Sequence, residues 1–78
     1  MIINKQRRNS IRNAINLLER SADLIDDVRM DEQYALDNIP ENLQNSEQYD
    51  AMEEAVDVLE SAVSDIKDLK DDLERIIA

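Results

Sequence analysis

The side chains of this chain that could do chemistry are almost all carboxylates. Nineteen of the 78 residues are Asp or Glu, nine are Lys or Arg, and there is no His, Cys or Gly. Thiolate nucleophiles, imidazole bases and disulfides are therefore excluded, and the carboxylates lack the His at i+3 that dimetal sites in helical bundles require. Without Gly, a Walker loop or a dinucleotide fingerprint is not expected. We expect no metal, no cofactor and no enzymatic activity.

The formal net charge of −10 indicates the kind of partner. A negative field repels nucleic acid and anionic membrane surfaces, so neither is expected to bind directly. A protein partner is expected to be basic or to have an apolar centre. The longest apolar runs are two or three residues, far short of the roughly 20 that span a bilayer, which predicts a soluble, cytoplasmic protein.

One connection divides the chain into two helical segments. The only proline, Pro40, lies in a stretch with three Asn and no helical periodicity, and proline disfavours α conformation in the residue before it. We therefore expect a single domain over 1–78, with one helix over about 5–37, a loop over 38–45 and a second helix over about 46–77. Asn38 is expected to end the first helix in a left-handed cap, and Ser46 to cap the second.

Apolar residues recur at alternating spacings of three and four along the second segment, as in a helix with one buried stripe. We assign eight of them to heptad positions a and d: Met52, Ala55, Leu59, Ala62, Ile66, Leu69, Leu73 and Ile76. Three more widen the stripe at position e: Val56, Val63 and Ile77. Leu59 and Ile66, at central positions, are expected to be fully buried.

The first segment is less regular. Its expected apolar face, with Leu17 and Leu24 at the flanks, consists of Ile11, Ala14, Ile15, Leu18, Ala22, Ile25, Val28, Ala35 and Leu36. Arg7, Arg8 and Arg12 lie at the positive end of the helix dipole and need compensation. If the chain folds back near residue 42, residues whose numbers sum to about 84 lie alongside each other. These Arg are then expected to pair with the acids of 68–75.

The two segments predict an all-α antiparallel helical hairpin that resembles a coiled coil. A lone hairpin of this length leaves much of each wide stripe exposed to water. A small core without disulfide or metal supplies no more than about 3–5 kcal/mol. Dimerisation into a four-helix bundle covers the stripes, and a bundle with a different chain is the alternative.

The loop carries a short motif, Asn-x-Pro-Glu-x-Leu-Gln-x-Ser-Glu, over residues 38–47, followed two residues later by Tyr49. With the acidic helix after it, the motif resembles a family of small uncharacterised helical-hairpin proteins of bacteria, phages and other mobile elements. The resemblance covers about residues 34–77. It implies an α-hairpin and a mobile-element setting, but no activity.

The same loop has two interpretations. In the structural one, its apolar residues cover the end of the bundle and Pro40 starts a helical turn. In the functional one, Glu41, Asn42 and Gln44 form a recognition loop, because ordered loops present polar groups on a rigid scaffold.

A possible partner surface lies on the face of the first helix opposite its core. Five residues share this face: Asp23, Asp27, Met30, Tyr34 and Asp37. An acidic rim around Met and Tyr suits a basic partner with an apolar centre. Alternatively, the loop folds over Tyr34 and hides it.

The outer surface of the second helix carries nine carboxylates from Glu53 to Glu74, over a rise of about 32 Å. Their spacing of about 3.5 Å is close to the phosphate spacing of about 3.4 Å along a DNA strand. We take five as representatives of this acidic row: Glu53, Asp57, Glu60, Asp68 and Asp71. The row could mimic DNA, or it could be an ordinary solvated face interrupted by Lys67, Lys70 and Arg75. The sequence therefore favours a non-catalytic protein-interaction module. The alternative is a DNA-mimicking inhibitor of a nucleic-acid-binding protein in a phage or mobile element.

Overall fold

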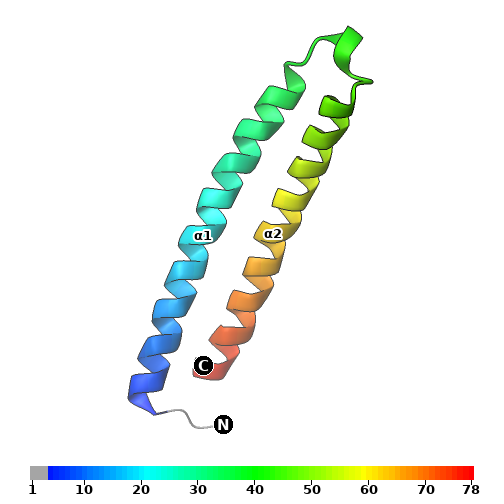
Figure 1. The fold of residues 1–78 in the computed structure, drawn as a ribbon. Helices are drawn as coiled ribbons and strands as arrows, with labels where there is room; N and C mark the ends of the chain where they lie inside the picture. The colour runs from blue at the N-terminus through cyan, green and yellow to red at the C-terminus, as the bar shows by residue number, and fades with distance from the viewer. Residues whose placement is uncertain (1–3) are drawn as a thin grey trace.

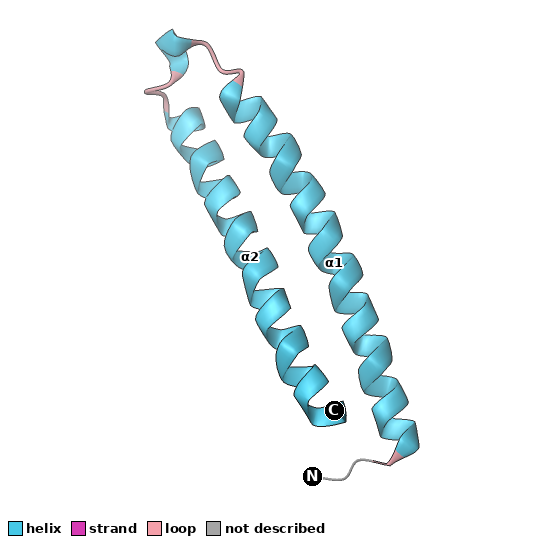
Figure 2. Cartoon of the chain, turned by 180° about the vertical axis from the view of Figure 1, so that it is seen from behind, coloured by secondary structure: helices cyan, strands magenta, loops and turns pink. Residues whose placement is uncertain are grey.

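The computed structural model describes residues 4–78 as two long helices joined by a short loop (Figure 1). Helix α1 spans Lys5–Asp37, the 3-10 turn η1 spans Glu41–Leu43, and helix α2 spans Glu47–Ile77. The helices run antiparallel and side by side in both views (Figure 2). The prediction of an all-α hairpin is confirmed, with no strand among the described residues.

Side chains satisfy backbone groups where each helix begins and where α1 ends. Asn4 Oδ1 accepts from Arg7 N at 2.9 Å, and Ser46 Oγ accepts from Tyr49 N at 3.1 Å, which confirms the predicted Ser46 cap. The left-handed cap predicted for Asn38 is wrong, because its φ is −99°. Its side-chain Nδ2 instead donates to Tyr34 O at 2.7 Å, so a carbonyl at the helix end is satisfied without a positive φ angle.

Pro40 precedes the 3-10 turn of the loop and helps to form it. Pro40 has φ −56° and ψ 146°, and its carbonyl accepts from Leu43 N at 2.9 Å to start the 3-10 turn η1. Leu43 is nevertheless 49% exposed, so it covers the end of the hairpin only in part. The three polar candidates of this loop, Glu41, Asn42 and Gln44, are all exposed.

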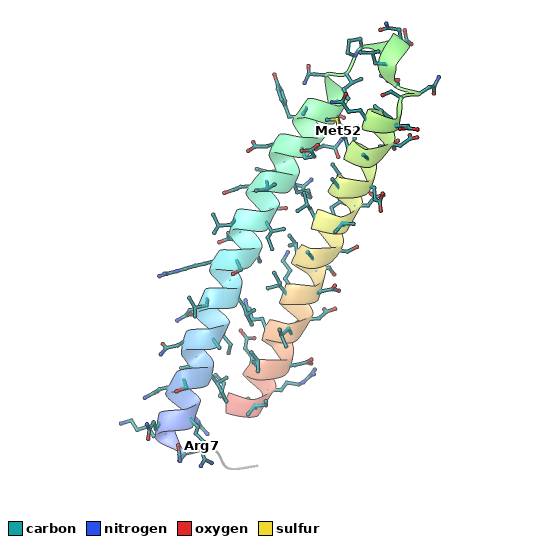
Figure 3. The ribbon with its side chains drawn as sticks, viewed as in Figure 1. Arg7 and Met52 are labelled. Atoms are coloured by element: carbon teal, nitrogen blue, oxygen red, sulfur yellow. The ribbon has the colours of Figure 1, made fainter. Side chains whose placement is uncertain are left out.

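The helices meet along a seam of residues spaced alternately by three and four. On α1 the seam consists of Arg8, Ile11, Ile15, Leu18, Ala22, Ile25, Arg29, Glu32 and Leu36. On α2 it consists of Tyr49, Met52, Val56, Leu59, Val63, Ile66, Lys70, Leu73 and Ile77. All are buried or half-buried, and Met52 lies at the loop end of the seam (Figure 3).

The seam of α2 differs from the predicted heptad assignment. Val56, predicted at the flanking position e, is 4% exposed and is the most buried of the four core residues. Leu69 and Ile76, predicted at the core position d, are 48% and 41% exposed. The apolar stripe is wider than the surface that one neighbouring helix covers, so α1 covers only the side that carries Val56. Leu59 and Ile66 lie in the seam but are half-buried, not fully buried.

The apolar face predicted for α1 also needs correction, because Val28 and Ala35 are exposed while Arg29 occupies the seam.

The pairing of the two helices also differs from the prediction. The two ion pairs between helices join Glu19 to Lys70 and Arg29 to Glu60, so contacting residues sum to 89 rather than to 84. The side chains of a helix lean toward its N-terminus. In an antiparallel pair, two side-chain tips that meet therefore belong to residues with higher numbers than the two backbone positions that lie side by side, and this raises the sum.

This pairing leaves the basic beginning of α1 without the predicted acidic partners. A sum of 89 places Arg12 beside Ile77, where α2 ends, and Arg7 at the first helical turns (Figure 3) lies beyond it. No ion pair within residues 4–78 includes Arg7, Arg8 or Arg12. Arg12 Nη1 instead donates to Asn9 Oδ1 at 3.1 Å.

Candidate interaction surfaces

The seam divides the surface of the hairpin into two faces. On each helix, the residue before a seam residue and the residue after it lie about 100° to either side. Two antiparallel helices are related by a local twofold axis perpendicular to their common plane. The residues that precede seam residues therefore lie on the same face of the hairpin in both helices, and the residues that follow lie on the opposite face.

The face of preceding residues is mostly apolar, and we call it the apolar face. It consists of Ala14, Leu17, Ser21, Leu24, Val28 and Ala35 from α1 and Ala51, Ala55, Val58, Ala62, Leu69 and Ile76 from α2. Six of these side chains are large and 41–66% exposed: Leu17, Leu24, Val28, Val58, Leu69 and Ile76. Arg7, Ser10 and Gln48 occupy the remaining preceding positions toward the ends. Asp31, Asp65 and Asp72 interrupt the face between apolar residues, and Asp65 lies near the middle of α2. An apolar surface that three aspartates interrupt therefore runs along both helices.

The opposite face carries the ion pairs between the helices, and we call it the ion-pair face. Lys70 Nζ lies 2.8 Å from Glu19 Oε1 and 3.9 Å from Glu74 Oε1. Arg29 Nε lies 2.9 Å from Asp26 Oδ1, and its Nη1 lies 3.8 Å from Glu60 Oε1. Each cation extends from the seam to carboxylates of both helices, so these charges set the relative position of the helices more than they stabilise them.

The carboxylates beside Lys70 and Arg29 stabilise the charged forms of these two cations. The hydrogen bond to Glu19 is the main cause that raises the pKa of Lys70, with partial burial acting in the opposite direction. The hydrogen bond to Asp26 likewise raises the pKa of Arg29. Lys70 is the group of the two that titrates within an accessible pH range.

Lys70 should therefore stabilise the hairpin in a pH-dependent way. The pKa of Lys70 is higher in the folded state than in the unfolded state. The Lys70 charge therefore stabilises the fold fully below the unfolded pKa of about 10.4, and this stabilisation is lost as the pH rises through the folded pKa. We expect Lys70→Met to lower the melting temperature at pH 7 and the difference from the parent chain to shrink above pH ~10.5. Thermal circular dichroism at three pH values measures this difference.

Lys67→Met is the matched control, because Lys67 is exposed and makes no ion pair with the described residues. It should change the melting temperature less at pH 7. A Lys70→Met difference that stays constant up to pH 11 contradicts a role for the Lys70 charge.

The structure exposes the predicted Met30–Tyr34 surface. Tyr34 is 73% exposed and Met30 is 50% exposed, so the loop does not cover Tyr34, and that alternative is wrong. Asp23, Asp27 and Asp37 are exposed beside them. None of these carboxylates makes an ion pair within residues 4–78. Asp23, Met30 and Asp37 follow seam residues and belong to the ion-pair face, whereas Asp27 and Tyr34 lie beyond it on the outer side of α1.

The five representatives of the acidic row are also exposed. Glu53, Asp57, Glu60 and Asp71 follow seam residues and belong to the ion-pair face, whereas Asp68 lies on the outer side of α2. Glu60 pairs with Arg29, whereas the other four, Glu53, Asp57, Asp68 and Asp71, make no ion pair within the described part of the chain. No group of three or more carboxylates in that part is arranged to hold a metal ion. The row therefore consists mostly of carboxylates without an ion pair among the described residues, and cations interrupt it.

Sequence reasoning did not identify the seam positions of Arg29 and Lys70 or the single-sided apolar face. The signal was present, because both cations continue the three- and four-residue spacing of apolar residues such as Ile25 and Ile66.

No helix within residues 4–78 has the length and hydropathy to cross a bilayer. The chain matches no known family model, no curated protein and no solved structure. The resemblance carried by the loop motif stays a prediction.

Proposed function

We propose that the hairpin is a non-catalytic protein-interaction module that dimerises through its apolar face into a four-helix bundle. The observation that carries this proposal is the position of the six large exposed apolar side chains on one face. Soluble monomers rarely expose contiguous apolar patches larger than a few hundred Å² unless the patch binds something. The ion-pair face has the polar character of a surface that stays in water.

The exposed area supports an interface of ordinary size. The hairpin has an accessible surface of 6057 Å², whereas a compact monomer of 9.0 kDa exposes about 4,850 Å². The excess of about 1,200 Å² exceeds the roughly 800 Å² that each partner contributes to a standard interface. A second copy with the same face provides a surface of the same length and apolar character.

Sedimentation at different concentrations tests the dimer. We expect a dimer at micromolar concentration, because burial of the apolar face supplies stability that the narrow seam lacks. Loss of helicity on dilution, measured by circular dichroism, is expected if folding and association are coupled. A thermally stable monomer at 100 µM contradicts the proposal.

The Met30–Tyr34 surface is available to a further partner in such a bundle, because it lies away from the apolar face. Its charge and its exposed Tyr and Met suit a basic protein with an apolar centre. Four free carboxylates of the acidic row favour the second candidate function. In that function the row occupies the basic groove of a nucleic-acid-binding protein in a phage or mobile element.

Two sets of variants separate these functions on a partner recovered by pull-down from the native host. Tyr34→Ala should weaken binding by about 1 kcal/mol or more if Tyr34 anchors the partner. Conversion of Glu53, Asp57, Glu60, Asp68 and Asp71 to amides should abolish binding and its salt dependence if the row mimics DNA. Affinity at two salt concentrations is the measurement, with circular dichroism as the control for folding. Salt-insensitive binding that survives the amide variant excludes mimicry.

A further inference from the structure

We propose that the two hairpins of the dimer pair head to tail, so that the loop of each copy lies beside the open end of the other. This inference rests on the proposed dimer and specifies its arrangement. Two hairpins can bring their apolar faces together in two symmetric ways. A twofold axis parallel to the helices places both loops at the same end, and an axis that crosses the helices places them at opposite ends.

The charge of the hairpin differs strongly between its two halves. The middle of α1 is near Ser21 and the middle of α2 is near Ala62, so residues 22–62 form the loop half. This half holds 13 carboxylates and one cation, Arg29, whereas the open half holds six carboxylates and eight cations. The loop half thus has a formal charge of −12 and the open half has +2.

This charge difference favours the head-to-tail arrangement. If both loops lay at the same end, two halves of −12 would face each other. In the head-to-tail arrangement, each half of −12 faces a half of +2. Packed helices lie about 8–10 Å apart, which is close to the screening length of about 8 Å at physiological salt. Neighbouring halves therefore interact through their charges, and like-charge contact selects against the same-end arrangement.

The side chains of the apolar face are compatible with this arrangement. An axis through the middle of the bundle crosses α1 between residues 22 and 23 and α2 between residues 63 and 64. Ser21 and Ala62 of the apolar face lie next to it, and these small residues allow close approach of the helices. On α1, residues whose numbers sum to about 45 then face each other, so Leu17 lies opposite the partner's Val28. On α2, the sum is about 127, and Val58 lies opposite the partner's Leu69. Large apolar residues meet on both sides of the axis, whereas Asp65 lies opposite the partner's Ala62 next to the axis.

Distances between spin labels test the arrangement. The chain has no Cys, so Asn42→Cys places one label on the exposed loop of each copy. Head-to-tail pairing should give a distance of about 50 Å, because each helix of about 30 residues rises 1.5 Å per residue. Same-end pairing should give about 20 Å, because adjacent helices are 8–10 Å apart. Dipolar electron paramagnetic resonance measures both ranges.

Ser64→Cys is the control, because Ser64 is exposed on the ion-pair face near the middle of α2. Its labels should lie roughly 30 Å apart in either arrangement, since the bundle is two helix diameters of 10–12 Å thick. A label distance of about 50 Å at Asn42 together with one of about 30 Å at Ser64 supports head-to-tail pairing. A short Asn42 distance overturns it while the dimer stands. No dipolar coupling at Ser64 overturns the dimer and the arrangement together.

Discussion

Truncation of Ile15 to alanine is expected to lower the free energy of unfolding by about 2–5 kcal/mol. Ile15 is 6% exposed and lies in the seam, so Ile15→Ala removes apolar contacts and leaves a cavity that the thin hairpin can fill only by moving one helix. Small domains have a total stability of about 5 kcal/mol. The variant should therefore be largely unfolded at 37 °C, as thermal and urea denaturation will show.

Leu17→Ala is the matched control, because Leu17 is two residues away on the same helix but 62% exposed. Below the concentration at which the hairpin dimerises, this variant should lose less than about 1 kcal/mol. At higher concentration its loss should increase, since Leu17 then lies in the interface. Equal melting temperatures for Ile15→Ala and the parent chain would show that the seam is assigned to the wrong residues.

Introduction of lysine on the apolar face is expected to dissociate the dimer. Leu24→Lys combined with Leu69→Lys buries four unpaired ammonium groups per dimer, and an isolated charge is costly in an apolar interface. We expect the dissociation constant to rise at least 100-fold, which corresponds to about 2.7 kcal/mol. Analytical ultracentrifugation over a concentration series measures the constant.

Asn16→Lys combined with Ser64→Lys controls for the change in charge. Both residues are exposed and follow seam residues, so they lie on the ion-pair face, and the double variant alters net charge by the same amount as the apolar-face variant. Its dissociation constant should stay within a few fold of that of the parent chain. Equal effects of the two double variants would place the interface elsewhere.

Local signals predicted the elements of the fold well. The spacing of apolar residues and the position of Pro40 predicted two helices and one loop, and Ser46 was identified as a cap because its role depends only on the backbone next to it. The end of α1 was predicted less well. The last carbonyls of α1 can be satisfied by backbone N–H groups in a left-handed cap or by the side-chain amide of Asn38, as in the structure. The choice depends on how the loop continues.

The side of α2 that faces α1 could not be deduced from the sequence. Leu69 and Val56 both belong to one wide stripe, and periodicity alone does not say which of them a single neighbour covers. Lys70 decides the matter in the structure, because its ammonium pairs with Glu19 only when Val56 and Val63 occupy the seam. The partner-surface residues Met30 and Tyr34 could be placed on a face from their spacing, but the exposure of Tyr34 depended on the path of the loop.

The hairpin also has a mechanical consequence, which follows from the position of its one connection. The beginning of α1 and the end of α2 lie at the same end of the molecule, and the loop lies at the other (Figure 1). Tension applied between these two ends acts across the seam, so it opens one layer of side chains at a time, as in a zipper. Tension applied between the loop and either end acts along a helix and shears every layer of the seam at once. Resistance to force therefore depends on the attachment points, with the weak direction between the two ends of the chain.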